Sequence, residues 1–302
     1  MDNAVDFRIP VGENYQNRKT SYCTTKEEKL FSSILLHGDQ EPLASSLCTS
    51  VMLSAIRSGI PVHAIDTASS QNLSKLKKEC FNSNQDVEVG IAIDYKAMLT
   101  KMYDLYCERA FEKEKAPDKK FSPVLFIVNG GQNISDYTNN TTIELATTQA
   151  EPQPAATPSA PIDICTTPFP GRRRMQAAAA PTPVATVNKP SKIQARTALL
   201  ELVEKGREVG IGVCLWIDKN DVNSERSLLK DRCRLKVIFP AFSKHYESYL
   251  DDSFRPKMVH NVNNNMAIVE CFDADGAMQL KKIRVYQYDL TQQAFIEYLK
   301  RL

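Results

Sequence analysis

The sequence predicts an α/β fold in which a mostly parallel β-sheet is sandwiched between helices. Two short runs, VLFIV at 124–128 and IGVCLWI at 211–217, are apolar throughout, as is typical of strands buried on both faces. Residues 31–65 read as a strand, a helix and a second strand, and such units build parallel sheets with right-handed crossovers. Because strand and helix patterns alternate along most of the chain, the layered α/β class follows.

The first half of the chain supplies most of this alternation. An apolar piece at 7–11 is expected to form an edge strand. The apolar run at 32–37 predicts a strand that Gly38 ends, and apolar residues at helical spacing predict a helix from Ser45 to residue 57. Further on we expect strands at 60–65, 87–93 and 124–128, and helices at 73–80 and 95–112.

Residues 139–192 differ in composition from the rest. Nine of the sixteen prolines lie there, and alanine and threonine make up much of the remainder. Such a segment buries too little apolar surface to offset the entropy lost on ordering, so a disordered insert is expected. We therefore expect one domain in two parts, 1–138 and 193–302, separated by this insert.

The second half returns to alternation. A helical pattern from residue 193 leads through Gly210 into the strand at 211–217. A short helical or loop step at 228–233 precedes a strand at 235–239. The turn sequence DADG at 273–276 predicts a hairpin between 266–272 and 279–286, and Thr291 is a candidate N-cap for a closing helix.

Composition excludes several classes of protein. The chain has 302 residues, 42% hydrophobic and 25% charged, with a net charge of +2 that is too small to indicate nucleic-acid binding by itself. Its eight cysteines include no Cys-x-x-Cys pair and its four histidines are scattered, so no metal site is expected. No signal-peptide core or membrane-spanning run is found, so a cytoplasmic location with reduced thiols is expected.

The strand–helix junction at 31–56 has the frame of a phosphate-binding loop. That loop follows the pattern Gly, four residues, Gly-Lys, then Ser or Thr, between a strand and a helix. Gly38 and Ser45 stand at the outer positions, but Leu43 replaces the second glycine and Ala44 the lysine.

Several stretches, taken in order, resemble the motor domain of the FtsK/SpoIIIE family within the FtsK–HerA P-loop ATPases. The resemblance covers most of the chain outside the insert and implies a RecA-like sheet with a C-terminal hairpin and helix. The matching stretches are IPVG (9–12), ILLHG (34–38), SVMLSAI (50–56), HAIDT (63–67), VLFIVNG (124–130) and LLELVEKGREVGIGVCLWIDK (199–219). FtsK-like modules of type VII secretion systems and of DNA-translocating machines are the relatives that this resemblance implies.

The resemblance also identifies the positions that ATP hydrolysis needs. Asn129 stands where the Walker B aspartate would hold magnesium, and Gly130 stands in place of the catalytic glutamate. Asp218 lies in the sensor strand, where the family has a Thr-Gln pair. The implied site is therefore a vestigial nucleotide site of Gly38, Ser45 and Asn129, with no catalytic residue and no metal ligand.

Each of these residues also has a purely structural interpretation. Gly38 can simply end a strand, Ser45 can be a helix N-cap, and Asn129 can belong to a turn. Asp66 at the end of a strand can be a cap or turn residue. Trp216 lies in a buried strand and is expected to be part of the core.

Two groups of basic residues are candidates for contact with nucleic acid or a partner. One is Arg172, Arg173 and Arg174 in the insert. The other includes Arg232 and Arg234, with Lys205, Arg207 and Lys236 completing a basic face. Either group can equally be a solvated basic surface.

Three functions remain open. The sequence favours a non-catalytic FtsK-like module that assembles with active ATPase modules, as a homo- or hetero-oligomer, or that binds a translocated substrate. The alternative is an ATP-dependent DNA translocase subunit whose site a partner completes. The third is an α/β scaffold without a nucleotide site.

On the first hypothesis no cofactor is expected, although residual binding of ATP and magnesium is compatible with the sequence. The substrate would be DNA or a secreted protein, and the machine could lie beside a membrane complex.

Overall fold

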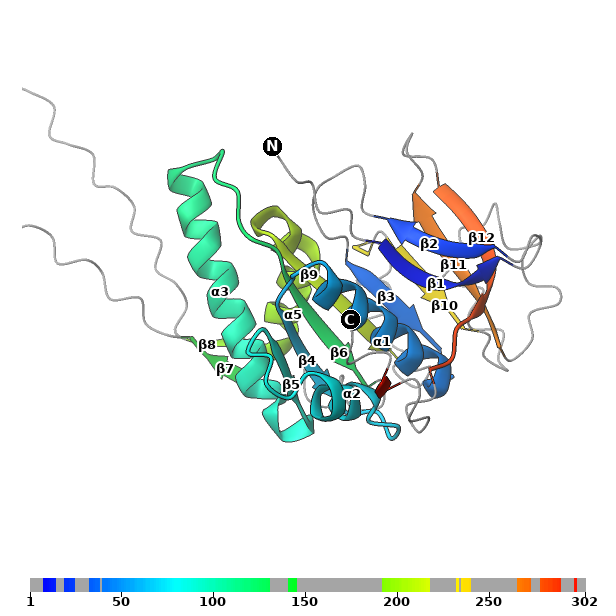
Figure 1. The fold of residues 1–302 in the computed structure, drawn as a ribbon. Helices are drawn as coiled ribbons and strands as arrows, with labels where there is room; N and C mark the ends of the chain where they lie inside the picture. The colour runs from blue at the N-terminus through cyan, green and yellow to red at the C-terminus, as the bar shows by residue number, and fades with distance from the viewer. Residues whose placement is uncertain are drawn as a thin grey trace, which may run out of the picture.

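The computed structural model describes residues 8–14, 19–24, 33–38, 40–130, 141–145, 192–217, 232–233, 235–239, 265–272, 278–288 and 296–297. Within these residues ten strands form one sheet in the order β2-β1-β12-β11-β10-β3-β9-β6-β4-β5 (Figure 1). The strands are β1 (Arg8–Asn14), β2 (Thr20–Thr24), β3 (Ile34–His37), β4 (Val62–Asp66), β5 (Val87–Gly90), β6 (Val124–Asn129), β9 (Ile211–Ile217), β10 (Leu235–Ile238), β11 (Met266–Phe272) and β12 (Met278–Val285).

The six strands from β10 to β5 form the parallel part of the sheet. Every residue of β3, β6, β9 and β10 is buried, which confirms that the apolar runs at 124–128 and 211–217 are covered on both faces. From β3 the chain moves outward to β4 and β5, returns through β6 and β9, and places β10 on the other side of β3. This is the expected RecA-like sheet.

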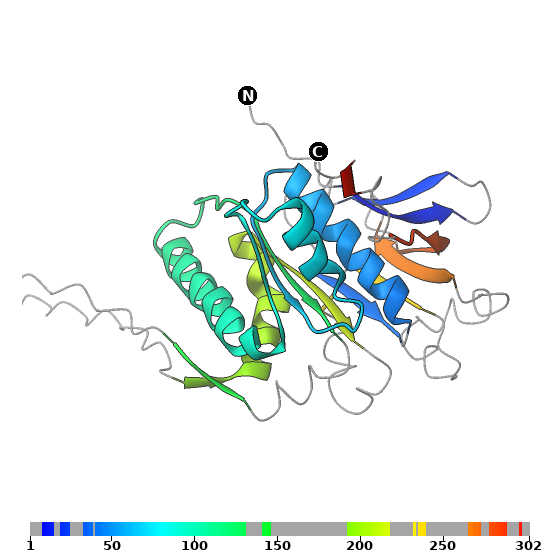
Figure 2. The ribbon, with the colours of Figure 1, turned by 60° about the horizontal axis from the view of Figure 1, so that its bottom comes forward.

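Helices cover both faces of the parallel strands (Figure 2). Leu36 points into the apolar cluster under α1 and α2, while its neighbour Leu35 belongs to the cluster under α3 and α5. This alternation follows from the two-residue period of a strand and gives the domain a separate core on each face. The helices are α1 (Glu41–Arg57), α2 (Asn72–Cys80), α3 (Tyr95–Lys115) and α5 (Ala195–Lys205).

Antiparallel strands extend the sheet beyond β10. The predicted hairpin forms as β11 and β12, which pair along seven residues each. The strand expected at 7–11 exists as β1, but it is not an edge strand, because β12 and β2 pair with its two sides. Strand β2 was not predicted from the sequence, because its residues, TSYCT, have no apolar pattern.

Two predicted boundaries were wrong. Helix α1 begins at Glu41 rather than at Ser45, because Pro42 is accommodated in a first helical turn, where its missing N–H costs nothing. Gln40 is therefore the N-cap, and the interpretation of Ser45 as the N-cap is wrong. Strand β5 ends at Gly90 rather than at Ile93, because the Asp94 carboxylate accepts the Ile91 N–H at 2.9 Å and closes a 3₁₀ turn.

The insert departs from and returns to a short antiparallel ladder. Strand β7 (Thr142–Glu144), which lies within the range predicted to be disordered, pairs with β8 (Lys192–Gln194), which begins at the last residue of that range. Ile143 and Leu145 are buried in the cluster under α3 and α5. The ordered domain therefore includes residues 141–145, and residues 146–191 lie outside the described part of the chain.

Other expectations also fall outside the described residues. They concern Arg172, Arg173, Arg174, Asp218, Arg234 and most of the closing helix, of which only 296–297 are described. In the part of the chain that is described, no helix combines the length and the apolar character needed to cross a membrane.

Lys236 does not lie on the solvated basic face that the sequence suggested. It stands opposite Glu270 in the β10–β11 ladder, and the two side chains form an ion pair. The Lys236 residue is 8% exposed and Glu270 is 1% exposed. Both charges are desolvated, so each depends on the other for compensation.

Replacing Glu270 by glutamine is expected to reduce the free energy of unfolding by about 3–5 kcal/mol, because it leaves the Lys236 ammonium buried without its counter-charge. Urea denaturation measures the loss. The matched control is the double variant Lys236→Met/Glu270→Leu, which removes both charges and should lie close to the wild type. Equal losses in the single and double variants would contradict this account.

Candidate functional site

The candidate site lies at the carboxyl ends of parallel strands, where open α/β sheets generally bind ligands. Strand β4 ends at Asp66 and β6 ends at Asn129, and the two residues are opposite each other in the ladder. Gly38 follows β3, and α1 begins three residues later with Glu41. The site is therefore formed by two strand ends, one glycine turn and one helix N-terminus.

The side-chain amide of Asn129 is the centre of the site. Its Nδ2 donates to Asp66 Oδ1 at 2.8 Å and to Ser45 Oγ at 3.2 Å. Asn129 and Ser45 are completely buried and Asp66 is 2% exposed. The structure thus brings together two of the three predicted site residues, Ser45 and Asn129. Asn129 Oδ1 has no hydrogen-bond partner among the described residues.

The Asp66 carboxylate accepts hydrogen bonds from both β6 and α2. Its Oδ1 accepts the Asn129 amide, while its Oδ2 accepts the backbone N–H of Ser74 in the first turn of α2 at 2.8 Å. The interpretation of Asp66 as a capping residue is confirmed. Burial raises the pKa of the Asp66 carboxyl, and the hydrogen bonds from Ser74 and Asn129 oppose that rise.

The segment 67–70, which we call the covering segment, lies against this centre. The backbone N–H groups of Thr67 and Ala68 donate to the Asn129 carbonyl at 2.8 and 3.0 Å. The Ser70 hydroxyl donates to Ser45 Oγ at 2.9 Å. The Ser45 hydroxyl oxygen and the Asn129 backbone carbonyl therefore both accept hydrogen bonds from the covering segment.

Glu41 fastens the covering segment to α1. Its Oε1 accepts the Ser70 N–H at 2.8 Å and the Ser69 hydroxyl at 2.5 Å. A carboxylate in the first turn of a helix is also favoured by the positive end of the helix dipole. Glu41 and Ser70 were not predicted as members of the site, because their contact depends on how α1 and the covering segment meet.

Gly38 has a structural role that requires glycine. Its φ is +130°, and a Cβ there would lie 2.9 Å from the Phe239 carbonyl oxygen. Its N–H donates to Ile217 O at 3.1 Å and its carbonyl accepts the Trp216 indole N–H at 3.0 Å. The expected core position of Trp216 is confirmed, at 3% exposed. Among the described residues, the hydrogen bonds of Gly38 run to β9 rather than to Ser45 or Asn129.

Gly130 is closed in by the covering segment. A Cβ at this position would lie 1.3 Å from Thr67 Oγ1, so no side chain fits unless the segment moves. The resemblance places the catalytic glutamate of the family at this position.

Ala44 and Leu43 lie inside the first turns of α1 and are 0% and 2% exposed. A lysine in place of Ala44 would have to bring its ammonium group out of an apolar cluster. The family's loop is thus replaced by helix at these positions.

The basic candidates are only partly described. Arg232 donates to Glu204 Oε2 at 2.6 Å, and its side chain is 29% exposed. It is thus paired within the domain. In the described residues, no group of three or more His, Cys, Asp or Glu side chains is arranged to hold a metal ion.

Replacing Asn129 by aspartate is expected to destabilise the fold, because a second carboxylate would face Asp66 Oδ1 across 2.8 Å. Two carboxylates so close share a proton, which raises the apparent pKa of the pair. The folded variant then holds this proton above the ordinary aspartate pKa, so its stability falls as the pH rises toward the raised value. The fall is about 1.4 kcal/mol for each pH unit between the ordinary and the raised pKa. Urea denaturation at about pH 5 and about pH 8 measures it.

The matched control exchanges the two groups. In Asp66→Asn/Asn129→Asp an amide again faces a carboxylate, and the Ser74 N–H keeps an acceptor. This double variant should recover most of the lost stability. A single variant as stable as the wild type at both pH values would show that the amide is not the centre of the site.

Replacing Gly130 by alanine is expected to cost about 1–3 kcal/mol, as overpacking typically does, because the new methyl group overlaps Thr67 Oγ1. Chemical denaturation of a double-mutant cycle tests the cause. In a Thr67→Ala background the cost of the same change should shrink, since the overlapping hydroxyl is gone. An equal cost in both backgrounds would refute the contact.

Comparisons with known proteins give structural relatives alone. No family model matches the chain, and no curated protein matches it. Among solved structures, the pCW3 conjugation coupling protein TcpA, in its monomer form with ATPγS, aligns with a TM-score of 0.57 and 9% identity over 100% of this chain and 72% of its own.

Two EssC structures align comparably. EssC ATPases 2 and 3 from Geobacillus thermodenitrificans give a TM-score of 0.55 and 12% identity over 98% of this chain and 47% of theirs. The cytoplasmic domain of EssC gives 0.51 and 11% identity over 94% and 43%. This chain therefore spans less than half of these EssC chains. At such identities the comparisons establish the fold alone: the chain has the α/β fold that TcpA and the EssC structures share.

Proposed function

We propose that this chain is a non-catalytic FtsK-like module that acts by binding and assembly within a translocation machine. The observation that supports this most is the buried network in which Asn129 donates to Ser45 and Asp66 while Ser70 donates to Ser45. The groups that would hold magnesium in an active relative are thereby bonded to the chain itself. The fold relatives are ATPase modules of secretion and conjugation machines.

ATP hydrolysis in P-loop proteins requires a lysine on the β- and γ-phosphates, a hydroxyl and an aspartate on magnesium, and a group that positions the attacking water. Here Ala44, Asn129 and Gly130 stand at three of these positions. One preorganised contact to developing charge typically contributes about 3–4 kcal/mol to transition-state stabilisation. The three missing groups would act on the phosphates, on magnesium and on the attacking water, so one compensating residue cannot replace them all.

The N-terminus of α1, where a phosphate would bind in a P-loop protein, is also unfavourable for an anion. A helix N-terminus following a strand binds phosphate through its free N–H groups. Here Glu41 places a carboxylate in that first turn, and the covering segment is bonded to it. We infer that the residues present do not fit magnesium–ATP, and that Asn129 Oδ1, which has no hydrogen-bond partner among the described residues, is the atom left for residual binding.

Assembly with active modules is the mode of action that this proposal implies. The EssC relative from Geobacillus thermodenitrificans contains ATPases 2 and 3 in one chain, and this chain covers 47% of it. A module of this size would accordingly act beside others, in the same polypeptide or in an oligomer. The handled substrate would be a secreted protein or DNA, and the location would be cytoplasmic, as in the cytoplasmic domain of EssC.

The alternative is an active translocase subunit whose site a partner completes. Its support is the 3.2 Å hydrogen bond between Ser45 and Asn129, the two positions to which the resemblance assigns magnesium ligands. In that case the partner must supply both a cation for the phosphates and a carboxylate for the water.

The purified protein is expected to show no binding of ATP by calorimetry at millimolar nucleotide, and no magnesium-dependent release of phosphate, with or without DNA. The reason is the loss of the lysine and of the Walker B aspartate. Ser45→Ala should then alter stability but no activity, since Ser45 serves only the internal network. A catalytically active FtsK-like domain assayed in parallel is the positive control.

Either of two results would contradict this expectation. Micromolar magnesium-dependent binding, or hydrolysis that DNA or a partner stimulates and Ser45→Ala abolishes, would refute the proposal and establish the alternative.

A further inference from the structure

Among the described residues, strand β5 forms one edge of the sheet. It is the last strand in the sheet order, and β4 is its pairing partner (Figure 1). The Val62 N–H donates to Asp86 O at 2.7 Å, so Asp86, Glu88 and Gly90 direct their backbone groups toward β4. Since alternate residues face opposite sides, Val87 and Val89 direct theirs outward. The Val87 N–H donates to Asn84 O at 3.4 Å, so among the described residues the Val87 carbonyl and the N–H and carbonyl of Val89 have no strand beside them.

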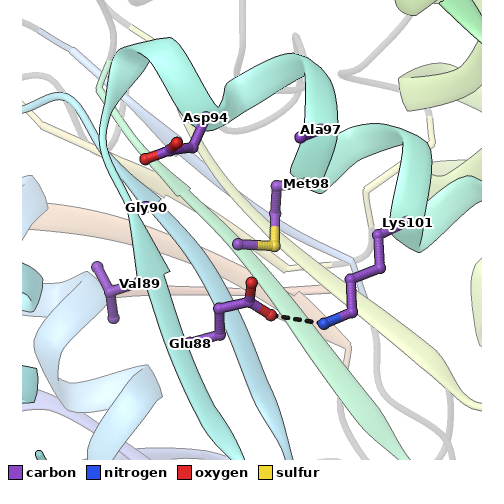
Figure 3. A pocket seen from close by; sticks show the side chains of 7 residues that line it. All are labelled: Glu88, Val89, Gly90, Asp94, Ala97, Met98 and Lys101. Carbon is purple, nitrogen blue, oxygen red and sulfur yellow. Dashed lines mark hydrogen bonds and ion pairs between the residues drawn. The ribbon is translucent and has the colours of Figure 1, made fainter.

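A pocket lies directly beside this edge, between β5 and the start of α3. Figure 3 shows Glu88, Asp94, Met98 and Lys101 around it. Gly90 allows the two elements to approach closely, since a Cβ there would lie 2.8 Å from Asp94 Cβ. Met98, 4% exposed, lies between Asp94 and the Glu88–Lys101 pair and provides an apolar surface there (Figure 3).

The charges around the pocket leave one carboxylate uncompensated. Glu88 Oε2 is shared by Lys101 Nζ at 2.6 Å and His63 Nδ1 at 2.9 Å. The bond from Lys101, followed by that from His63, holds the pKa of the Glu88 carboxyl below its ordinary value. Asp94 accepts the Ile91 N–H at 2.9 Å, and it has no cationic partner among the described residues.

Apolar side chains lie at the end of the same edge. Ile91 is 50% exposed and Ile93 is 83% exposed. With Phe111 they are the large apolar side chains that the described part of the chain exposes. An open backbone edge, an uncompensated carboxylate over a methionine, and two exposed isoleucines therefore occur together within residues 87–101.

We propose that the outer edge of β5 binds an extended segment of a partner protein in which basic and apolar residues alternate. The open groups of Val87 and Val89 would extend the sheet by one strand, since strand addition uses main-chain hydrogen bonds. A lysine or arginine on one face of that strand lays its stem on Met98 and its cationic head on Asp94. The apolar residues that alternate with it cover Ile91 and Ile93. This inference goes beyond the proposed function and uses none of its residues.

The test is fluorescence polarisation with two labelled seven-residue peptides, one alternating valine with lysine and the other valine with glutamate. The full chain should bind the lysine peptide at least about 10-fold more tightly, a difference of about 1.4 kcal/mol. Asp94→Asn retains an acceptor for Ile91 N–H but loses the charge, and should weaken binding about 3- to 10-fold. Glu79→Gln, an exposed charge change on α2, is the matched control and should have no effect.

A second variant tests the backbone. Val89→Pro removes an N–H that points away from β4, a position where an edge strand tolerates proline, and it should abolish binding. Ile93→Ser, at an exposed residue, removes an apolar contact without adding a charge, tests the same edge without depending on how proline is accommodated, and should weaken binding as Asp94→Asn does. Equal affinity for the two peptides, no binding of either, or binding that Asp94→Asn and Ile93→Ser leave unchanged would overturn the proposal. None of these results bears on ATP hydrolysis, which is measured separately.

Discussion

The Asn129 amide is the constraint on which the candidate site depends. It joins β6, which ends with Asn129, to β4 through Asp66 and to α1 through Ser45. Asp66 continues the connection to α2 through the Ser74 N–H. Because all three side chains are buried, loss of one bond leaves a polar group without water, which costs more than the bond itself contributes. The amide and Asp66 therefore link the ends of two paired strands to the first turns of two helices.

The hydrogen-bonding chemistry of amides and carboxylates explains why Asn129 and Glu41 bond to other groups of the chain. An asparagine donates to a carboxylate, whereas an aspartate in its place would repel one and attract a cation. The chain therefore satisfies with its own hydrogen bonds a position that the resemblance assigns to a magnesium ligand. The same holds for Glu41, whose negative charge stands at the helix N-terminus and is used by Ser69 and Ser70. Both side chains thus form hydrogen bonds within the chain.

The fold was largely predictable from the sequence, and the site only in part. Continuous apolar runs identified β6 and β9, and helical spacing identified α3 and α5, because burial imposes these periods directly. Strand β2 has no such pattern, since its place is decided by pairing with β1. The start of α1 was predicted wrongly, because a phosphate-binding loop was expected up to Ser45, whereas the helix already begins at Glu41. Contacts such as Glu41 with Ser70 join residues 29 positions apart and have no local signal.

Because β7 and β8 pair with each other, the number of residues between them has only a small effect on the stability of the domain. Thr142 stands opposite Gln194, so the chain leaves and re-enters the domain at the same place. The entropic cost of closing a loop grows only with the logarithm of its length, about 0.6 kcal/mol for each doubling. The residues between the two strands can consequently lengthen, shorten or change composition over evolutionary time while the ten-stranded sheet keeps its geometry.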